Sequence, residues 1–128
     1  MAGFNESAQL SKYKVTITEI KEEIPEVQWA PGEGNKYIGF KFVVENTCEE
    51  TINMKGTNVY CIVDGEMMPI FNQSPFETPK SGNILPGIKN SGWFVYEVPE
   101  NTKEFEIRFG QYITFKFQNP LLEENIEE

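Results

Sequence analysis

The chain has 128 residues, of which 39% are hydrophobic and 13% aromatic, and eleven basic residues against twenty acidic ones give it a formal charge of −9. A chain of this length is typical of one domain, which buries about two thirds of its unfolded surface. The negative charge repels phosphate backbones and anionic lipids, which argues against nucleic-acid and membrane-surface partners. The sequence contains no apolar run of the roughly 18 to 20 residues that a membrane span needs.

The first predicted strand runs from Lys12 to Ile20, because apolar and polar residues alternate along it. After Glu19 the alternation slips by one residue, which indicates a bulge or the end of the strand. Residues 22–36 carry two prolines and two glycines. We therefore predict a long loop there, with Trp29 near its middle.

The strongest apolar stripe lies between Tyr37 and Asn46, and we expect this segment to be the central strand. Shorter strands are predicted for Thr51–Met54 and Asn58–Val63. The dipeptide Asp64-Gly65 follows, and Asp-Gly between apolar runs is typical of a tight hairpin turn, because both central positions favour positive φ. Residues 67–71 are the expected return strand.

Residues 72–83 are rich in Pro, Ser, Thr and Gly without periodicity, which predicts a second long loop. Three strands follow, at Gly92–Val98, Glu104–Phe109 and Tyr112–Phe117, and we expect the last two to form a closing hairpin. No helical stripe of useful length appears. Seven or eight strands at this spacing predict an all-β fold, an immunoglobulin-like sandwich of two antiparallel sheets without substantial helix.

We place the sandwich domain at residues 12–118, between an N-terminal extension at 1–11 and an acidic C-terminal tail at 119–128. The extension has neither the basic region nor the apolar region of a signal peptide. Two alternatives follow. Either the protein stays inside the cell, or this sequence begins after a signal that has been removed.

Four segments carry a family resemblance: Phe40–Asn46, the strand that ends at Asp64-Gly65, Gly82–Gly87 and Gly92–Pro99. In this order they resemble the bacterial telokin-like family, small immunoglobulin-like domains found mostly in secreted antigens and surface lipoproteins, largely without assigned function. The resemblance covers residues 12–117. It implies a fold and an extracellular or cell-surface location, with a cytoplasmic location as the alternative, and it implies no reaction.

The sequence contains few residues that carry chemistry. It has no histidine, which excludes Ser-His-Asp and Cys-His catalysis and histidine-bound metals. Cys61 alternates with apolar residues and is expected in the core, whereas Cys48 lies in a polar turn, which argues against a disulfide between them. Asp64 is the only aspartate, so calcium-binding loops are excluded.

The remaining enzymatic possibility is a carboxylate pair of the kind that glycosidases use. Among nineteen glutamates, however, some carboxylate pairs arise by chance. Glu45 and Glu97 are expected on solvated strand faces. We therefore predict no catalytic residues, no metal site and no cofactor, and we expect that the protein is not an enzyme.

Binding is the function that this composition favours, because immunoglobulin-like scaffolds bind through end loops or one sheet face. We expect a non-catalytic binding or interaction module of the cell envelope or exterior, with a protein as its partner. Trp29 in the first long loop, and Phe71, Pro75 and Phe76 in the second, are large apolar residues in polar segments. They form an exposed recognition patch, or they fold back to close the open ends of the sandwich.

A second binding mode is strand addition at an open sheet edge. Lys14, Thr16 and Thr18 on the first strand suit an edge that stays soluble or one that accepts a partner. The alternative function is an intracellular structural or assembly subunit that uses sheet edges and the acidic tail. For either function we expect a monomer or a weak homo-oligomer.

Overall fold

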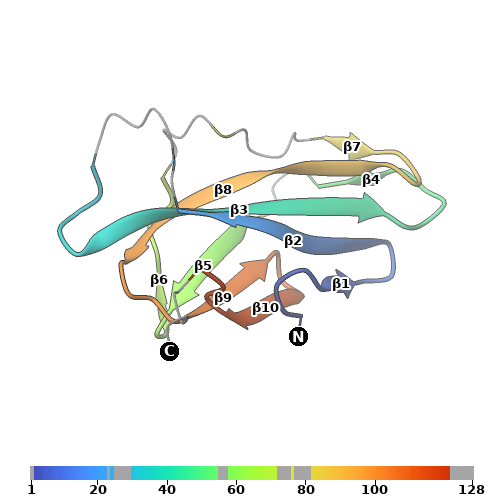
Figure 1. The fold of residues 1–128 in the computed structure, drawn as a ribbon. Coiled ribbons are helices and arrows are strands. Elements are labelled where there is room, and N and C mark those ends of the chain that lie inside the picture. The colour runs from blue at the N-terminus through green and yellow to red at the C-terminus, as the bar shows by residue number, and fades with distance from the viewer. Residues whose placement is uncertain are drawn as a thin grey trace.

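Two antiparallel sheets pack face to face in the computed structural model, which describes residues 2–22, 24, 30–54, 58–71, 76 and 82–121 (Figure 1). The strands, in chain order, are β1 (Ser7–Gln9), β2 (Tyr13–Lys21), β3 (Asn35–Asn46), β4 (Ile52–Asn53), β5 (Val59–Val63), β6 (Glu66–Met67), β7 (Asn83–Ile84), β8 (Lys89–Pro99), β9 (Glu104–Phe109) and β10 (Ile113–Gln118). The described residues contain no helix, so the predicted all-β class is confirmed.

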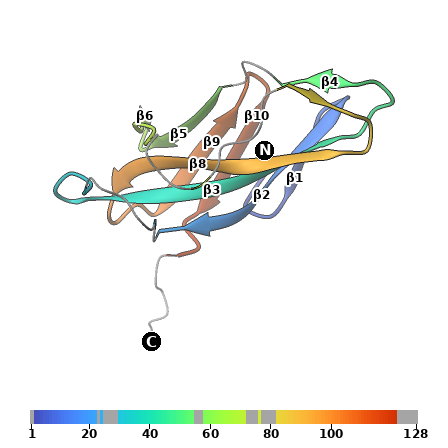
Figure 2. The ribbon, with the colours of Figure 1, turned by 90° about the horizontal axis from the view of Figure 1, so that it is seen from above.

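The first sheet has the strand order β1-β2-β3-β8 and the second has the order β10-β9-β5-β6. Strands β4 and β7 pair separately, at one end of the sandwich (Figure 2). The predicted central strand is β3, which lies between β2 and β8 in the first sheet. The predicted closing hairpin is the β9–β10 pair.

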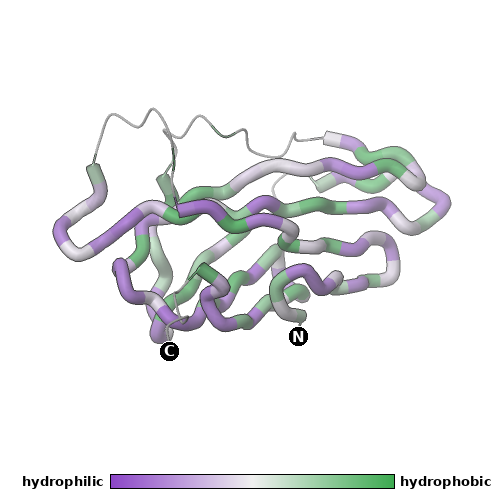
Figure 3. The backbone as a smooth tube through the Cα atoms, in the orientation of Figure 1, coloured by the Kyte–Doolittle hydropathy of each residue, from purple (hydrophilic) through white to green (hydrophobic). Residues whose placement is uncertain are grey.

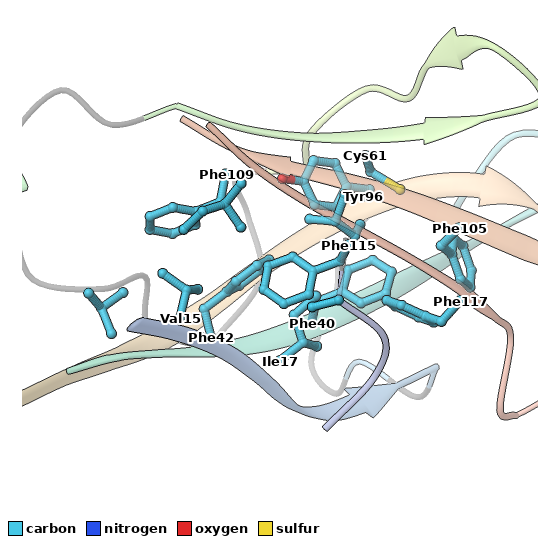
Figure 4. Close-up of a cluster of buried hydrophobic side chains, with 14 of the residues drawn as sticks. Val15, Ile17, Phe40, Phe42, Cys61, Tyr96, Phe105, Phe109, Phe115 and Phe117 are labelled. Carbon is cyan, nitrogen blue, oxygen red and sulfur yellow. The ribbon is translucent and has the colours of Figure 1, made fainter. Parts of the chain in front are cut away.

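The core lies between the two sheets, and its largest side chains are aromatic (Figure 4). Along the tube in Figure 3, hydrophobic and hydrophilic residues alternate on most strands, as a sheet with one buried face requires. The predicted inward stripes are buried, and their phenylalanines form edge-on and tilted ring pairs across the interface. The fully buried apolar side chains include those of Val15, Ile17, Ile38, Phe40, Phe42, Tyr96, Val98, Phe105, Ile107 and Phe115.

The turn at Asp64-Gly65 has φ angles of 53° and 81°, as the Asp-Gly dipeptide predicts. The return strand is shorter than expected, because the chain leaves the second sheet after β6. The main chain of Pro69 then accepts a hydrogen bond from the N–H of Glu97, at 3.0 Å, and Ile70 forms a bridge with Tyr96 of β8. Residues 69–71 therefore cross to the edge of the first sheet.

The first predicted strand is not an open edge at Lys14 and Thr16, which corrects the expectation from the sequence. These two residues pair with Gln9 and Ser7 of β1. The hydroxyls of Ser7 and Thr16 share a hydrogen bond of 2.6 Å. A strand of three small or polar residues has no alternation to reveal it, which is why sequence periodicity misses β1.

The break in alternation on this strand is a register shift against β3 that lies at Thr18, between Ile17 and Glu19. It falls one residue before the predicted position.

The two cysteines are free thiols, with Cys61 buried and Cys48 half-buried. The predicted orientation of Cys61 into the core is confirmed.

Candidate aromatic binding surface

Phe71 lies on the outer face of the first sheet, the face that points away from the core. Its ring stacks on the ring of Tyr37, with centroids 4.2 Å apart and planes 20° apart. Its main-chain N–H donates to the C=O of Val95 at 2.7 Å, which fixes this part of the chain beside β8. The ring is half-buried.

Phe76 packs on the same face, against Trp93 of β8. The two ring centroids lie 4.7 Å apart, at an interplanar angle of 31°. The ammonium of Lys21 lies 6.0 Å from the Phe76 ring and 5.9 Å from the Trp93 ring, within reach of a cation–π attraction. We call the four rings of Tyr37, Phe71, Phe76 and Trp93 the aromatic surface.

The other two residues that the sequence suggests for binding, Trp29 and Pro75, lie outside the described residues. Phe71 and Phe76 cover the broad face of a sheet. This position differs from the second of the two alternatives, in which they close the open ends of the sandwich. Because both rings are half-buried, each presents part of its surface to solvent while the rest packs on the sheet.

Gly39 of β3 provides the space in which Trp93 lies. A β-carbon at position 39 would approach Trp93 Cε3 to 3.3 Å, closer than ordinary van der Waals contact, and Val95 Cγ2 to 3.4 Å. The absence of a side chain therefore lets the indole pack against the backbone of the neighbouring strand. Val95 is 3% exposed and forms the floor of the aromatic surface beside Trp93.

Glu97 lies at the border of the aromatic surface, opposite Tyr37 in the β3–β8 ladder. Its carboxylate accepts hydrogen bonds from Asn35 Nδ2 at 2.9 Å and from the main-chain N–H of Gly32 at 2.8 Å. These two donors hold the pKa of Glu97 below its usual value. Burial, and secondarily the Glu97 charge, raises the pKa of Tyr37. Glu97 thus anchors the residues before β3 to the sheet.

Glu45 and Glu97 do not form a catalytic pair. In the β3–β8 register Glu45 is opposite Lys89, eight positions along β3 from Tyr37, which is opposite Glu97. At about 3.4 Å per residue the two carboxylates are roughly 27 Å apart, whereas glycosidase pairs are separated by about 5 to 10 Å. Glu45 instead forms an ion pair with Lys14 at 3.6 Å.

The described residues also contain no group of three or more Cys, Asp or Glu side chains arranged to hold a metal ion. Within the same part of the chain, no helix is long and apolar enough to cross a membrane.

Two of the four rings of the aromatic surface, Tyr37 and Trp93, are not identified from the sequence. Lys21, which lies beside this surface, is also not identified. A signal for the first two exists, because both lie on the strand face opposite to the apolar stripe. Large aromatic residues on a face that is otherwise polar indicate that something covers that face. Lys21 has no such signal, because its position depends on where Phe76 packs.

A family model described as a domain of unknown function, DUF4352, matches residues 2–119. No curated protein sequence matches the chain significantly. Among solved structures, a conserved hypothetical protein from Bacillus anthracis is similar with a TM-score of 0.66 and 11% identity, over 90% of this chain and 94% of its own. The secreted protein MPT63 from Mycobacterium tuberculosis has a TM-score of 0.64 and 10% identity, over 93% and 97% of the two chains.

A predicted lipoprotein from Bacillus subtilis, ycdA, is similar with a TM-score of 0.70 and 14% identity over 88% of this chain, which spans 38% of that protein. At these identities the likeness is one of fold. The family model, in contrast, covers nearly the whole sequence, from β1 to the end of β10, and the chain therefore belongs to the DUF4352 family of domains of unknown function.

Proposed function

We propose that this domain is a non-catalytic binding module of the cell envelope or exterior, and that it binds a protein partner through the aromatic surface. The observation that carries the proposal is the pair of half-buried rings, Phe76 on Trp93, beside the Lys21 ammonium. Aromatic side chains are enriched in the buried centre of protein interfaces, where they contribute much of the binding energy.

The proposed location is supported by two similar folds, one in a protein described as secreted and one in a predicted lipoprotein. The resemblance of four segments to telokin-like domains points the same way. The absence of a catalytic role is part of the proposal, and it is supported by the lack of histidine in the sequence and by the wide separation of Glu45 and Glu97.

Affinity capture with a matched control tests the binding role. Immobilised wild-type domain and the variants Phe76→Ser and Tyr60→Ala are incubated with envelope and culture-supernatant fractions of the source organism. Tyr60 is an aromatic residue on the outer face of the second sheet, 37% exposed. We expect a protein that the wild type and Tyr60→Ala retain and that Phe76→Ser loses. Equal retention by all three would contradict the aromatic surface as the contact.

Fractionation of the source organism with an antibody to the domain tests the location separately. The proposal expects the protein in the envelope or the medium. A cytoplasmic protein whose mass in light scattering rises with concentration would instead support the alternative of an intracellular assembly subunit. A cytoplasmic monomer would contradict both.

A further inference from the structure

A groove of about 290 Å³ lies between β1, the edge of the first sheet, and β10, the edge of the second. It is lined by Ala2, Ser7, Ala8, Gln9, Leu10, Tyr112, Ile113 and Thr114. None of these eight side chains is charged, although 24% of the residues in the chain are. The groove is therefore a neutral site on an acidic molecule.

One residue of this chain shows how the edge of β10 accepts an extended segment. The N–H of Ala2 donates to the C=O of Thr114 at 3.2 Å, and the C=O of Ala2 accepts from the N–H of Lys116 at 2.9 Å. Ala2 thereby forms a parallel bridge with Phe115, and its side chain is 8% exposed. Main-chain pairing and burial of a small side chain thus occur together at this edge.

The same hydrogen bonds establish which way the backbone of β10 faces. In an antiparallel ladder alternate residues direct both main-chain groups to the same side. Because Thr114 and Lys116 bond to Ala2, the even-numbered residues of β10 face away from β9. The N–H of Thr114 therefore points toward the groove, where the C=O of an incoming strand can accept it.

The opposite wall presents main-chain groups as well. Ala8 pairs with Val15 of β2, and the N–H of Leu10 donates to the C=O of Tyr13 at 2.8 Å. The even-numbered residues of β1 therefore bond to β2, and the main chains of Ser7 and Gln9 face away from it. Two strand edges thus border one groove.

We propose that this groove binds an extended, uncharged peptide segment of a partner protein by strand addition to β10. The main chain of such a segment can pair with the N–H of Thr114 and with the main-chain groups of Ser7 and Gln9 that face the groove, and main-chain pairing is how sheet edges recognise peptides. The lining side chains offer no charge to pair with a charged residue of the segment, which favours an uncharged one. The ring of Tyr112, 77% exposed at the groove, offers an apolar contact to the side chains of the peptide.

A phage library of ten-residue peptides, selected on the immobilised full-length domain, supplies the probe. The best binder is then synthesised and measured by calorimetry against the wild type, Thr114→Pro and Gln118→Pro. Proline at 114 removes the N–H that faces the groove and leaves the bonds to β9 intact. Gln118 also directs its N–H away from β9, at the other end of β10, so Gln118→Pro is the matched control.

We expect uncharged binders whose affinity falls about tenfold in Thr114→Pro and stays unchanged in Gln118→Pro. Amide hydrogen exchange of the wild type provides a readout that does not depend on how a variant folds. The Thr114 amide should exchange fast in the free protein and slowly with the peptide bound, while the Gln118 amide stays fast. Binders that leave Thr114 unprotected, or a library without binders, would overturn the proposal.

Protection of Thr114 in the free protein, together with a dimeric mass, would assign the groove to a second copy of the chain and would also overturn the proposal.

The aromatic surface lies on the outer face of β3 and β8, and β8 is at the opposite edge of the first sheet from β1. Phe76→Ser should therefore leave binding of the selected peptide unchanged, which separates this proposal from the proposed function.

Discussion

The hydroxyl of Tyr96 on β8 donates a hydrogen bond to the main-chain carbonyl of Val59 on β5, at 2.9 Å. These two strands belong to different sheets, so the bond joins the layers of the sandwich across the core. Tyr96 is 1% exposed, and its burial raises the pKa of the hydroxyl well above the usual value for tyrosine. The hydroxyl therefore remains a donor throughout the physiological pH range.

Replacing Tyr96 with phenylalanine tests the contribution of this bond to stability. The change keeps the ring in the core but removes the donor to the Val59 carbonyl, which should cost about 1 to 2 kcal/mol. We expect the midpoint of thermal unfolding to fall by about 3 to 8 °C. Tyr60→Phe, at an exposed position of β5, should leave the midpoint unchanged, and equal shifts in the two variants would contradict this account.

Asn46→Ala should be among the most destabilising substitutions in the chain. The side-chain amide of Asn46 is fully buried and donates to the carbonyls of Glu50 and Ile84, each at 2.8 Å, while its Oδ1 accepts from the N–H of Cys48 at 2.9 Å. Alanine removes all three of these hydrogen bonds, at a cost of about 3 to 5 kcal/mol in the free energy of unfolding.

Chemical denaturation of Asn46→Ala measures this cost, with Asn101→Ala at an exposed turn as the control. We expect the control to stay within about 0.5 kcal/mol of the wild type. A loss below about 1 kcal/mol in Asn46→Ala would show that the turn at 47–51 and β7 do not depend on this amide.

The two thiols should differ in reactivity toward a disulfide reagent at pH 8. Burial raises the pKa of Cys61 to about 12, so at pH 8 its reactive thiolate is scarce as well as shielded. Cys48 is half-buried and should react first. We expect one thiol to be labelled in the native protein and two in guanidinium chloride, and Cys48→Ser should abolish native labelling. Two unreactive cysteines in the denatured, unreduced protein would instead indicate a disulfide.

Glu97 should make the stability of the domain depend on acid pH. Its folded pKa is lower than its unfolded pKa, so its stabilising contribution is fully present above the unfolded value of about 4.3. That contribution is lost as the pH falls through the folded pKa. We expect Glu97→Gln to unfold at a lower temperature than the wild type at pH 7, and the difference to shrink below pH 4.

Thermal unfolding of both proteins between pH 7 and pH 2.5 measures this dependence. Asn35→Ala removes one of the two donors to Glu97. Like Glu97→Gln, it should weaken the dependence of the unfolding temperature on acid pH. A gap between wild type and Glu97→Gln that stays constant with pH would contradict the role assigned to these hydrogen bonds.

The sequence by itself determined the sandwich and most of its strands. Alternation along β3, β9 and β10 identifies their inward faces, because a strand with one buried side must place apolar residues at every second position. The Asp-Gly turn is predictable for a local reason, since its φ angles depend on the two residues themselves. The exclusion of histidine-based chemistry needs nothing but the composition.

Tertiary structure alone decided where the segments without periodicity lie. β1 is visible only through its pairing with β2, and the groove exists only because β1 and β10 end one sheet each. Phe71 and Phe76 could be assigned to loops from the sequence, but their ring partners Tyr37 and Trp93 come from strands far along the chain. Such contacts depend on how the sheets are ordered and on which loop crosses which face, and a local pattern of residues does not encode either.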